Sequence, residues 1–278
     1  MTNISLWNNL DTQKRKYHNG GQKKNDRESE AYVMDIRFEK REHLKEKPDQ
    51  KHLGFGKYMT DYMFVMDWTK EEGWKDARIV PEGPITMDPA CVTLHYAQET
   101  FEGMKAYRTA EGKIQLFRPE MNAKRMINSN ARLCMPEFPV DMFVEAVKAL
   151  VKVEEDWVPS EPETSLYIRP FMFATEAALG VHMASAYKFM IICCPVGAYY
   201  AEGINPVKIL VEDELVRAVK GGTGFTKCGG NYAGSILGQV KAEKMGYSQV
   251  LWLDGEHRKY VEEVGTMNIM FKIAGEIY

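Results

Sequence analysis

The feature that constrains this chain most is a glycine-rich segment with a single lysine, Gly221–Tyr232, which reads GGTGFTKCGGNY. Glycine is favoured where the backbone turns tightly or approaches a ligand closely. The strand-like stretch Val207–Val211 precedes it, and residues at helical spacing follow it, from Asn231 as N-cap to Gly246 as helix end. We therefore expect Lys227 just before a helix N-terminus, where an anion is stabilised and partial desolvation favours the neutral amine that an imine requires.

The same segment fits neither of the standard phosphate-binding glycine motifs. A Walker loop has Gly before its lysine and Ser or Thr after it, whereas Thr226 precedes Lys227 here and Cys228 follows it. The dinucleotide fingerprint fails because its last glycine position falls on Lys227. Glycine spacing alone therefore leaves two interpretations open, an ordinary flexible loop and a ligand site.

Composition narrows the class of protein. The 278 residues are 45% hydrophobic, which is enough for one or two domains with a full core. The formal net charge of −3 argues against nucleic acid as the main partner. The sequence has no apolar run that could span a bilayer and no signal-peptide core, so we expect no membrane partner and a cytoplasmic protein. Of the five cysteines, the adjacent Cys193 and Cys194 are interpreted as buried core thiols, and the six histidines show no metal-ligand spacing.

The order of patterns along the chain indicates an α+β fold with two domains. Residues 1–30 are polar and basic and predict a disordered tail. Beyond them, strands and helices mix without a regular βαβ repeat. We expect a small N-terminal domain over 31–197, a linker over 198–204 and part of a larger domain over 205–278. The last strand pattern stops within a hairpin, which would leave backbone groups unpaired, so we expect the large domain to be incomplete.

The expected elements follow from periodicity and turn signals. Strands are expected over Tyr62–Trp68, within Leu94–Tyr107, and over Ile114–Phe117, Leu166–Phe173, Tyr187–Pro195, Gln249–Leu253, Lys259–Glu263 and Met267–Ile273. Helices are expected over Pro119–Cys134 and Asp141–Trp157, and Lys70–Glu82 is interpreted as a connecting segment.

Three further positions carry side chains suited to chemistry. Tyr167 and Arg169 lie two apart in a strand and so share a face, where the arginine could bind a carboxylate; a surface pair is the alternative. By pattern alone, Arg125 belongs to a solvated polar helix face, and Glu263 is an ordinary carboxylate at the end of a strand.

Taken together, six segments resemble the branched-chain amino acid aminotransferases, which are fold-type-IV pyridoxal phosphate enzymes. The segments are His95-Tyr96, Phe101–Tyr107, Tyr167–Pro170, Pro195–Gly197, Gly221–Tyr232 and Glu263–Asn268. They occur in the family's order and cover the chain from about Leu53 to its end. The resemblance implies the two-domain fold-type-IV architecture, pyridoxal 5'-phosphate as cofactor and a homodimer for the complete protein.

The resemblance also implies roles around the cofactor. Lys227 matches the catalytic lysine that binds the cofactor's aldehyde carbon and then moves a proton as general base and acid. Glu263 matches the carboxylate that faces the ring nitrogen, and Tyr232 matches the phenol at the 3′-oxygen. Arg125 and Thr266 match contacts to the phosphate, which revises the interpretation of Arg125 from pattern alone.

On the substrate side, Tyr96, Phe101 and Tyr199 match aromatic walls of the side-chain pocket, which suit apolar branched side chains. Tyr167 and Arg169 match the pair that lines the same pocket, and Arg169 could accept the second carboxylate of glutamate or 2-oxoglutarate. The implied reaction transfers an amino group between leucine, isoleucine or valine and 2-oxoglutarate.

Alternatives remain within the same fold and outside it. D-amino-acid transaminases and aminodeoxychorismate lyases share the fold, but the Gly-Gly-Thr-Gly insertion and Tyr-Ile-Arg-Pro favour the branched-chain family. An inactive remnant that only binds a ligand or partner is supported by the expected incompleteness. A thiol enzyme centred on Cys228 is the third alternative, because a helix start can activate a thiol, although no histidine lies nearby in sequence.

Overall fold

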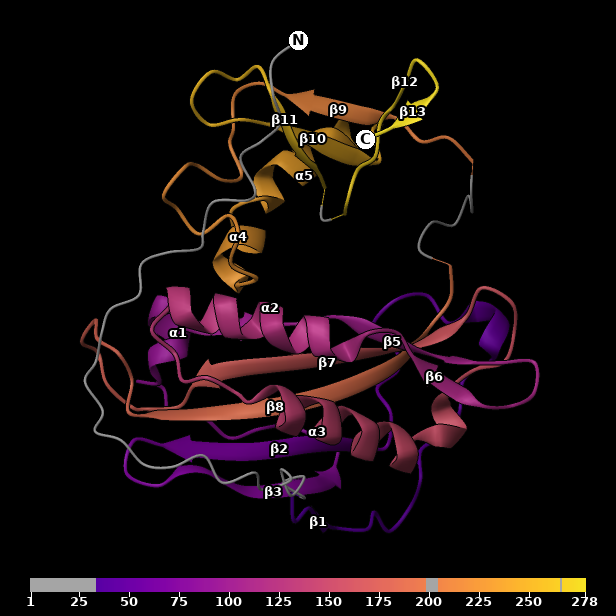
Figure 1. Cartoon of the computed structure of the whole chain (residues 1–278), viewed down its shortest axis with the longest axis vertical. Coiled ribbons are helices and arrows are strands. Elements are labelled where there is room, and N and C mark those ends of the chain that lie inside the picture. Colours follow the sequence, from indigo (N-terminus) through magenta and orange to yellow (C-terminus); the bar gives the residue numbers. More distant parts are fainter. Residues whose placement is uncertain (1–33, 199–204, 266) are drawn as a thin grey trace, which may run out of the picture. The chain divides into compact units, whose positions relative to one another are not determined.

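A mixed, mostly antiparallel sheet of eight strands organises the first part of the chain in the computed structural model, which describes residues 34–198, 205–265 and 267–278 (Figure 1). The strand order is β1-β3-β2-β8-β7-β5-β6, and β4 pairs with β7. The strands are β1 Arg37–Phe38, β2 Tyr62–Thr69, β3 Gly73–Pro81, β4 Glu99–Phe101, β5 Met104–Arg108, β6 Ile114–Leu116, β7 Ser165–Ala174 and β8 Ala186–Val196. Between these strands, β1 and β3 are parallel and the other pairs are antiparallel.

The central pair β7–β8 explains why the two faces of this sheet differ. Ser165 pairs with Val196 at one end and Ala174 with Tyr187 at the other. Side chains alternate between the faces of a strand, so Leu166, Ile168 and Met172 enter the main core. Tyr167, Arg169, Phe171 and Phe173 then share the opposite face. The alternation therefore directs the predicted pair of site residues away from the main core.

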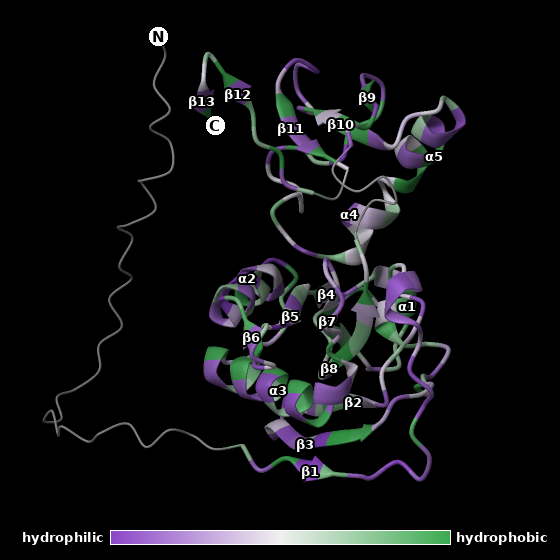
Figure 2. Cartoon of the chain, turned by 90° about the vertical axis from the view of Figure 1, so that its right-hand side faces the viewer, coloured by the Kyte–Doolittle hydropathy of each residue, from purple (hydrophilic) through white to green (hydrophobic). Residues whose placement is uncertain are grey.

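Two helices, α2 Pro119–Arg132 and α3 Val140–Val153, complete the main core (Figure 1). α3 presents one apolar face, and its buried residues recur at helical spacing (Figure 2). Phe143, Ala146, Val147 and Leu150 are fully buried. Burial of a side chain such as that of Leu150 contributes about 1.5–3 kcal/mol. The core thus fixes the strands and α2, on which several site residues lie.

The second part of the chain carries a smaller sheet, β9 Ile209–Glu212, β10 Gln249–Leu253 and β11 Val261–Val264. β10 is central, parallel to β9 and antiparallel to β11. The helix α5 Ile236–Lys244 packs on it, and a side chain at Gly238 would overlap the ring of Trp252, so the helix approaches the strand closely there. β12 Lys272–Ile273 and β13 Glu276–Ile277 form a separate hairpin. Short helices occur at α1 Val92–Tyr96 and α4 Gly229–Ala233, with 3₁₀ turns at Gln50–His52 and Glu155–Trp157.

Several expected elements differ from the structure. Lys70–Glu82 is not a connecting segment, because it contains β3. The expected strands within Leu94–Tyr107 give way at their start to α1, and within Met267–Ile273 only Lys272–Ile273 is a strand. The helix after the lysine has Cys228 rather than Asn231 as its N-cap, and it is divided into α4 and α5. Inside that helix, the side-chain amide of Asn231 donates to the carbonyls of Thr223 and Thr226, both at 2.7 Å. These bonds fold the glycine-rich segment back onto the helix that follows it.

The expected domain boundaries stay predictions. The eight-stranded sheet uses residues before 197 and the three-stranded sheet uses residues after 205, on either side of the predicted linker. Residues 199–204 and the predicted tail 1–30 lie outside the described part of the chain. The described residues all belong to one contact unit, Met34–Tyr278.

Candidate active site

The peptide of Lys227 is held on both sides by the N-terminal part of the chain. Its N–H donates to Ser129 Oγ on α2 at 3.0 Å. Its carbonyl accepts from the N–H of Phe101 on β4, also at 3.0 Å. The carboxylate of Glu99, on the same strand, accepts from the N–H of Gly229. The loop that carries the lysine is therefore anchored at three points to α2 and β4.

The amine of Lys227 lies among aromatic groups. Its Nζ donates to the phenol oxygen of Tyr232 at 2.7 Å. It also lies 4.7 Å from the ring centroid of Phe101, and the Phe101 and Tyr232 rings are 4.9 Å apart. This arrangement defines the direction of the amine and brings three of the predicted site residues together.

Arg125 forms a two-pronged ion pair with a buried carboxylate. Its Nε donates to Glu102 Oε1 at 2.6 Å and its Nη2 to Glu102 Oε2 at 2.7 Å. Glu102 is fully buried and also accepts from Asn122 Nδ2 at 2.8 Å. The Glu102 carboxylate raises the pKa of Arg125 above its usual value. A guanidinium has five N–H donors, so Arg125 keeps three for a ligand. The Arg125 side chain is 51% exposed, as its polar helix face predicts, but its partner Glu102 is buried, so Arg125 is an anchored surface residue rather than a freely solvated one.

Glu263 faces a second arginine, Arg217, with which it forms an ion pair. Burial raises the pKa of the Glu263 carboxyl, whereas the charges of Arg217 and Lys227 oppose this shift without cancelling it. Glu263 lies in β11 and Arg217 in the segment between β9 and the glycine-rich loop. The pair thus supplies a carboxylate beside a cation at the edge of the smaller sheet.

These groups surround one cavity of about 450 Å³. It is lined by Arg125, Arg217, Gly224, Phe225, Thr226, Lys227, Asn231, Tyr232, Glu263, Met267 and Asn268. The hydroxyl oxygen of Thr226 is buried at this cavity and, within the described residues, has no hydrogen-bond partner. Buried polar atoms are normally paired, so this hydroxyl is suited to a polar ligand.

The donor set of the cavity fits pyridoxal 5'-phosphate. A primary amine, an arginine with free donors and a carboxylate are the groups that an aldehyde, a phosphate and a protonated ring nitrogen require. Thr266 lies outside the described residues, so its predicted phosphate contact stays a prediction.

A larger cavity, of about 940 Å³, shares Lys227 and Tyr232 with the first. Its other lining residues are Phe55, Phe101, Lys105, Tyr167, Arg169, Val196, Gly197, Gln239, Glu243, Ser248 and Gln249. Arg169 donates Nη2 and Nε to the phenol oxygen of Tyr167 at 3.0 and 3.3 Å, and its guanidinium carbon lies 4.5 Å from the Phe101 ring centroid. The larger cavity therefore joins the lysine to aromatic surfaces and to a cation.

The two remaining predicted substrate residues are Tyr96 and Tyr199. Tyr96 is 41% exposed, donates its hydroxyl to the carbonyl of Leu179, and lines neither cavity. Tyr199 lies outside the described residues. Cys228 is buried and lines neither cavity, which weakens the alternative of a thiol enzyme.

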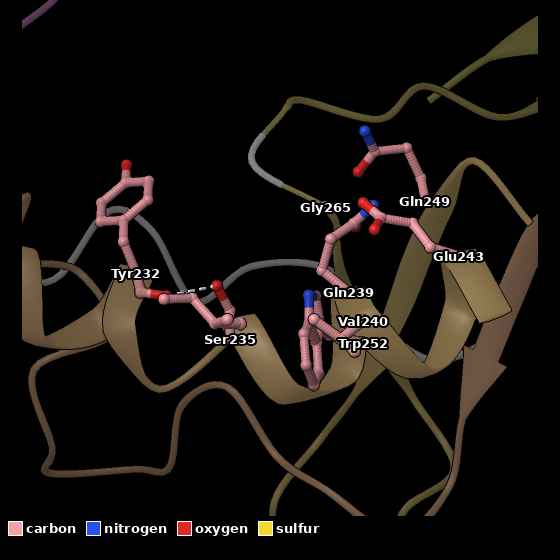
Figure 3. A pocket seen from close by; sticks show the side chains of 9 residues that line it. Tyr232, Ser235, Gln239, Val240, Glu243, Gln249, Trp252 and Gly265 are labelled. Atoms are coloured by element: carbon pink, nitrogen blue, oxygen red, sulfur yellow. Dashed lines mark hydrogen bonds between the residues drawn. The ribbon is translucent and has the colours of Figure 1, made fainter.

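A further hollow, of about 440 Å³, lies along α4 and α5 (Figure 3). At one end the Ser235 hydroxyl donates to the carbonyl of Tyr232 at 2.7 Å. The ring of Trp252, from β10, lies beside α5 near Val240. Lys227 does not line this hollow. We therefore assign the chemistry to the two cavities that contain the lysine.

Sequence reasoning missed Glu102, Arg217, Glu99 and Lys105. Glu102 and Lys105 stand within the Phe101–Tyr107 motif, so the motif was the available signal. Arg217 and Glu99 lie outside the quoted motifs, and only the folded chain brings them to Glu263 and Gly229.

Two features of the described residues bear on the class of protein. No group of three or more His, Cys, Asp or Glu side chains there is arranged to hold a metal ion. Nor does any helix in this part of the chain have the length and apolar character needed to cross a membrane.

Comparisons with known proteins identify the relatives. The chain is 54% identical over 242 residues to branched-chain-amino-acid aminotransferase 2 of Bacillus subtilis (strain 168), covering 87% of this chain and 67% of that protein. It is 55% identical to a probable branched-chain-amino-acid aminotransferase of Staphylococcus epidermidis, covering 87% and 68%. No family model matches the chain.

Solved structures that resemble this chain belong to the same family as these relatives. A branched-chain amino acid aminotransferase from the organism abbreviated T.th., solved with pyridoxamine 5'-phosphate, superposes with a TM-score of 0.63 at 30% identity, covering 77% of this chain and 66% of that one. This chain thus spans about two thirds of the length of the relatives it matches. At more than half identity over most of its length, it belongs to the branched-chain amino acid aminotransferases, pyridoxal phosphate enzymes of the fold-type-IV, α+β class.

Proposed function

We propose that this chain transfers an amino group between a branched-chain L-amino acid and 2-oxoglutarate, giving the branched 2-oxo acid and L-glutamate, with Lys227 as the catalytic residue. The observation that supports this most is the hydrogen bond of 2.7 Å from Lys227 Nζ to Tyr232, in a cavity that also contains Arg125 and Glu263. The names of relatives at 54–55% identity support the substrate class.

When bound, pyridoxal 5'-phosphate supplies an aldehyde for covalent attachment and a ring that accepts electrons from the substrate. In this proposal Glu263 faces the ring nitrogen and keeps a proton there, and Tyr232 orients the 3′-oxygen. Arg125 binds the phosphate with the donors that Glu102 leaves free, and Thr266 adds a further contact. Each group thus matches one polar atom of the cofactor.

Lys227 has two tasks in the proposed reaction. Its amine holds the cofactor until the substrate amino group replaces it. The freed amine would then take the proton from the substrate Cα as a base and deliver it to the C4′ carbon of the cofactor as an acid. The hydrogen bond to Tyr232 and the backbone anchors direct the amine, which supports its use as a positioned base.

The substrate side chain would enter the larger cavity. Phe101 and Tyr167 offer apolar surface for a branched side chain, and Arg169 accepts the second carboxylate of an acidic substrate. Tyr199 is proposed as a further wall, whereas Tyr96, which lines neither cavity of this chain, stays a prediction from the resemblance alone. Two structures of the T.th. enzyme, one with N-(5'-phosphopyridoxyl)-L-glutamate and one with 4-methylvaleric acid, support a pocket that takes both kinds of side chain. We also propose a homodimer for the complete protein and a cytoplasmic location.

The test compares Lys227→Ala with Lys152→Ala, a control at an exposed position of α3. Each protein is loaded with cofactor, reduced with borohydride and digested, and the peptide that contains residue 227 is weighed. Formation of glutamate from leucine and 2-oxoglutarate is measured in parallel. We expect the reduced adduct and activity in the wild type and the control, and neither in Lys227→Ala.

Two further substrates separate the alternatives. A wild type that turns over D-alanine or aminodeoxychorismate but not leucine would favour the other activities of this fold. Absence of any adduct on Lys227 would favour the inactive remnant and contradict the proposal.

A further inference from the structure

Lys105 lies on the same sheet face as the two residues that line the predicted side-chain pocket. In the antiparallel pair β5–β7 it stands directly opposite Tyr167. Opposed side chains on one face are separated by about 5 Å at Cβ, and diagonal neighbours by about 7–8 Å. Arg169, two residues beyond Tyr167, is therefore a diagonal neighbour of Lys105. Both cations line the larger cavity with Lys227.

The two cations differ in how firmly they are held. Arg169 is fixed by two hydrogen bonds to Tyr167 and by the ring of Phe101. In the described part of the chain, the side chain of Lys105 forms no hydrogen bond and no ion pair. Lys105 is partly buried, and an ammonium group without a protein partner is suited to an anion that arrives with a ligand. Lys105 is thus the movable charge of the pair.

Few acidic groups oppose these cations. Among the residues that line the cavity, Glu243 is the only carboxylate in the described part of the chain; it is exposed and accepts from Gln239 Nε2 at 3.0 Å. Burial raises the pKa of the Glu99 carboxyl, and Arg169 lies near enough for its charge to oppose that shift. The Glu99 carboxylate, however, accepts from Gly229 and does not line the cavity. The cavity is therefore positive where a substrate side chain would lie.

We propose that Lys105 determines specificity for the acidic substrate: its ammonium group, together with Arg169, binds the second carboxylate of glutamate or 2-oxoglutarate. This inference rests on the function proposed above. When a branched apolar side chain occupies the cavity, the flexible stem of Lys105 turns its ammonium group toward water and leaves methylene groups as wall. One pocket can then accept both an acidic and an apolar substrate side chain, because the Lys105 ammonium group lies in the pocket with the first and in water with the second.

The experiment compares Lys105→Gln with Lys105→Arg, which keeps the charge, and with Lys152→Gln, which removes an exposed lysine outside the cavity. Steady-state kinetics are measured with 2-oxoglutarate and with 4-methyl-2-oxopentanoate. Loss of one charge-assisted hydrogen bond is expected to raise KM for 2-oxoglutarate about 10-fold. The constants for 4-methyl-2-oxopentanoate should change less than about 2-fold, because that substrate lacks the second carboxylate. Lys105→Arg should retain most of the 2-oxoglutarate affinity.

A binding measurement decides the question without turnover. The affinities of glutarate and of 4-methylvalerate for the cofactor-loaded proteins are measured by calorimetry. We expect Lys105→Gln to lose glutarate affinity selectively. Equal losses for both ligands, or no loss for glutarate, would overturn the role of Lys105. A wild type that binds glutarate through Lys105 but forms no glutamate from leucine would instead contradict the proposed reaction.

Discussion

The carboxylate of Glu99 accepts a hydrogen bond from the backbone N–H of Gly229, two residues beyond Lys227. The approach is close enough that a Cβ added at Gly229 would overlap Glu99 Oε1. On the same strand, the N–H of Phe101 binds the carbonyl of Lys227. The glycine at position 229 thus leaves room for the Glu99 carboxylate to bind the lysine loop.

We expect Gly229→Ala to destabilise the fold by about 1–3 kcal/mol, because the new methyl group must displace the carboxylate. The double variant Gly229→Ala with Glu99→Ala should recover part of this loss, because it removes the group in the way. Urea unfolding of the wild type, both single variants and the double variant yields the coupling energy. Strictly additive effects would contradict the contact as the cause.

Arg217 controls the charge of Glu263. Burial raises the pKa of the Glu263 carboxyl, and Arg217 opposes that shift. Arg217→Met removes the opposition, so the pKa of Glu263 should rise further and a higher pH should be needed to ionise it. We expect the acidic limb of the activity profile to move to higher pH. Arg217→Lys, which keeps a positive charge, should move it much less.

The measurement is kcat/KM against pH, accompanied by cofactor affinity at the same pH values. A uniform loss of activity at every pH, with an unchanged limb, would show that Arg217 acts only through structure.

A buried carboxyl far from the site makes stability depend on pH. Glu154 is 1% exposed and accepts from the N–H of Tyr62. Burial raises its pKa to about 7, and the nearby charge of Asp61 adds to the shift. The folded chain therefore holds a proton that the unfolded chain releases between the ordinary carboxyl pKa of about 4.5 and 7. The stabilisation present below this window is lost as the pH rises through it.

Glu154→Gln keeps a hydrogen-bond acceptor and removes the titration. Relative to the wild type, we expect the variant to gain roughly 3 kcal/mol or less between pH 5 and pH 8. Urea unfolding at both pH values checks this. The same stability difference between variant and wild type at the two pH values would contradict a raised pKa at Glu154.

Sequence reasoning anticipated the long, strongly periodic elements and missed those whose pattern is broken. The apolar spacing of α3 and the uninterrupted β7 and β8 were readable directly. In β3, Asp76 has a positive φ of 52°, and the register with β2 shifts between Val65 and Asp67. This irregularity disrupts the alternation that would have indicated a strand. The five residues of α1 are too few for a helical period to emerge.

The site residues also divide into those that the motifs predicted and those that only the folded chain brings together. Motif resemblance predicted Lys227, Tyr232, Arg125 and Glu263, and these four line one cavity. The predictions of a branched-chain aminotransferase, of its fold class and of its cofactor are confirmed by the relatives. The partners Glu102 and Arg217 could not be paired from the sequence, because their contacts span 23 and 46 positions and follow no periodicity. The roles of the individual residues stay predictions.

The anchoring of the Lys227 peptide to Ser129 and Phe101 has a mechanical consequence. Although the residue belongs to the later half of the sequence, its backbone is tied to the sheet and helix of the earlier half. If the two parts of the chain rotated relative to each other about the predicted linker, the backbone of Lys227 would move together with Phe101, Tyr167 and Arg169. Such a rotation would therefore change the distance between Lys227 and the pocket that contains Arg169 very little.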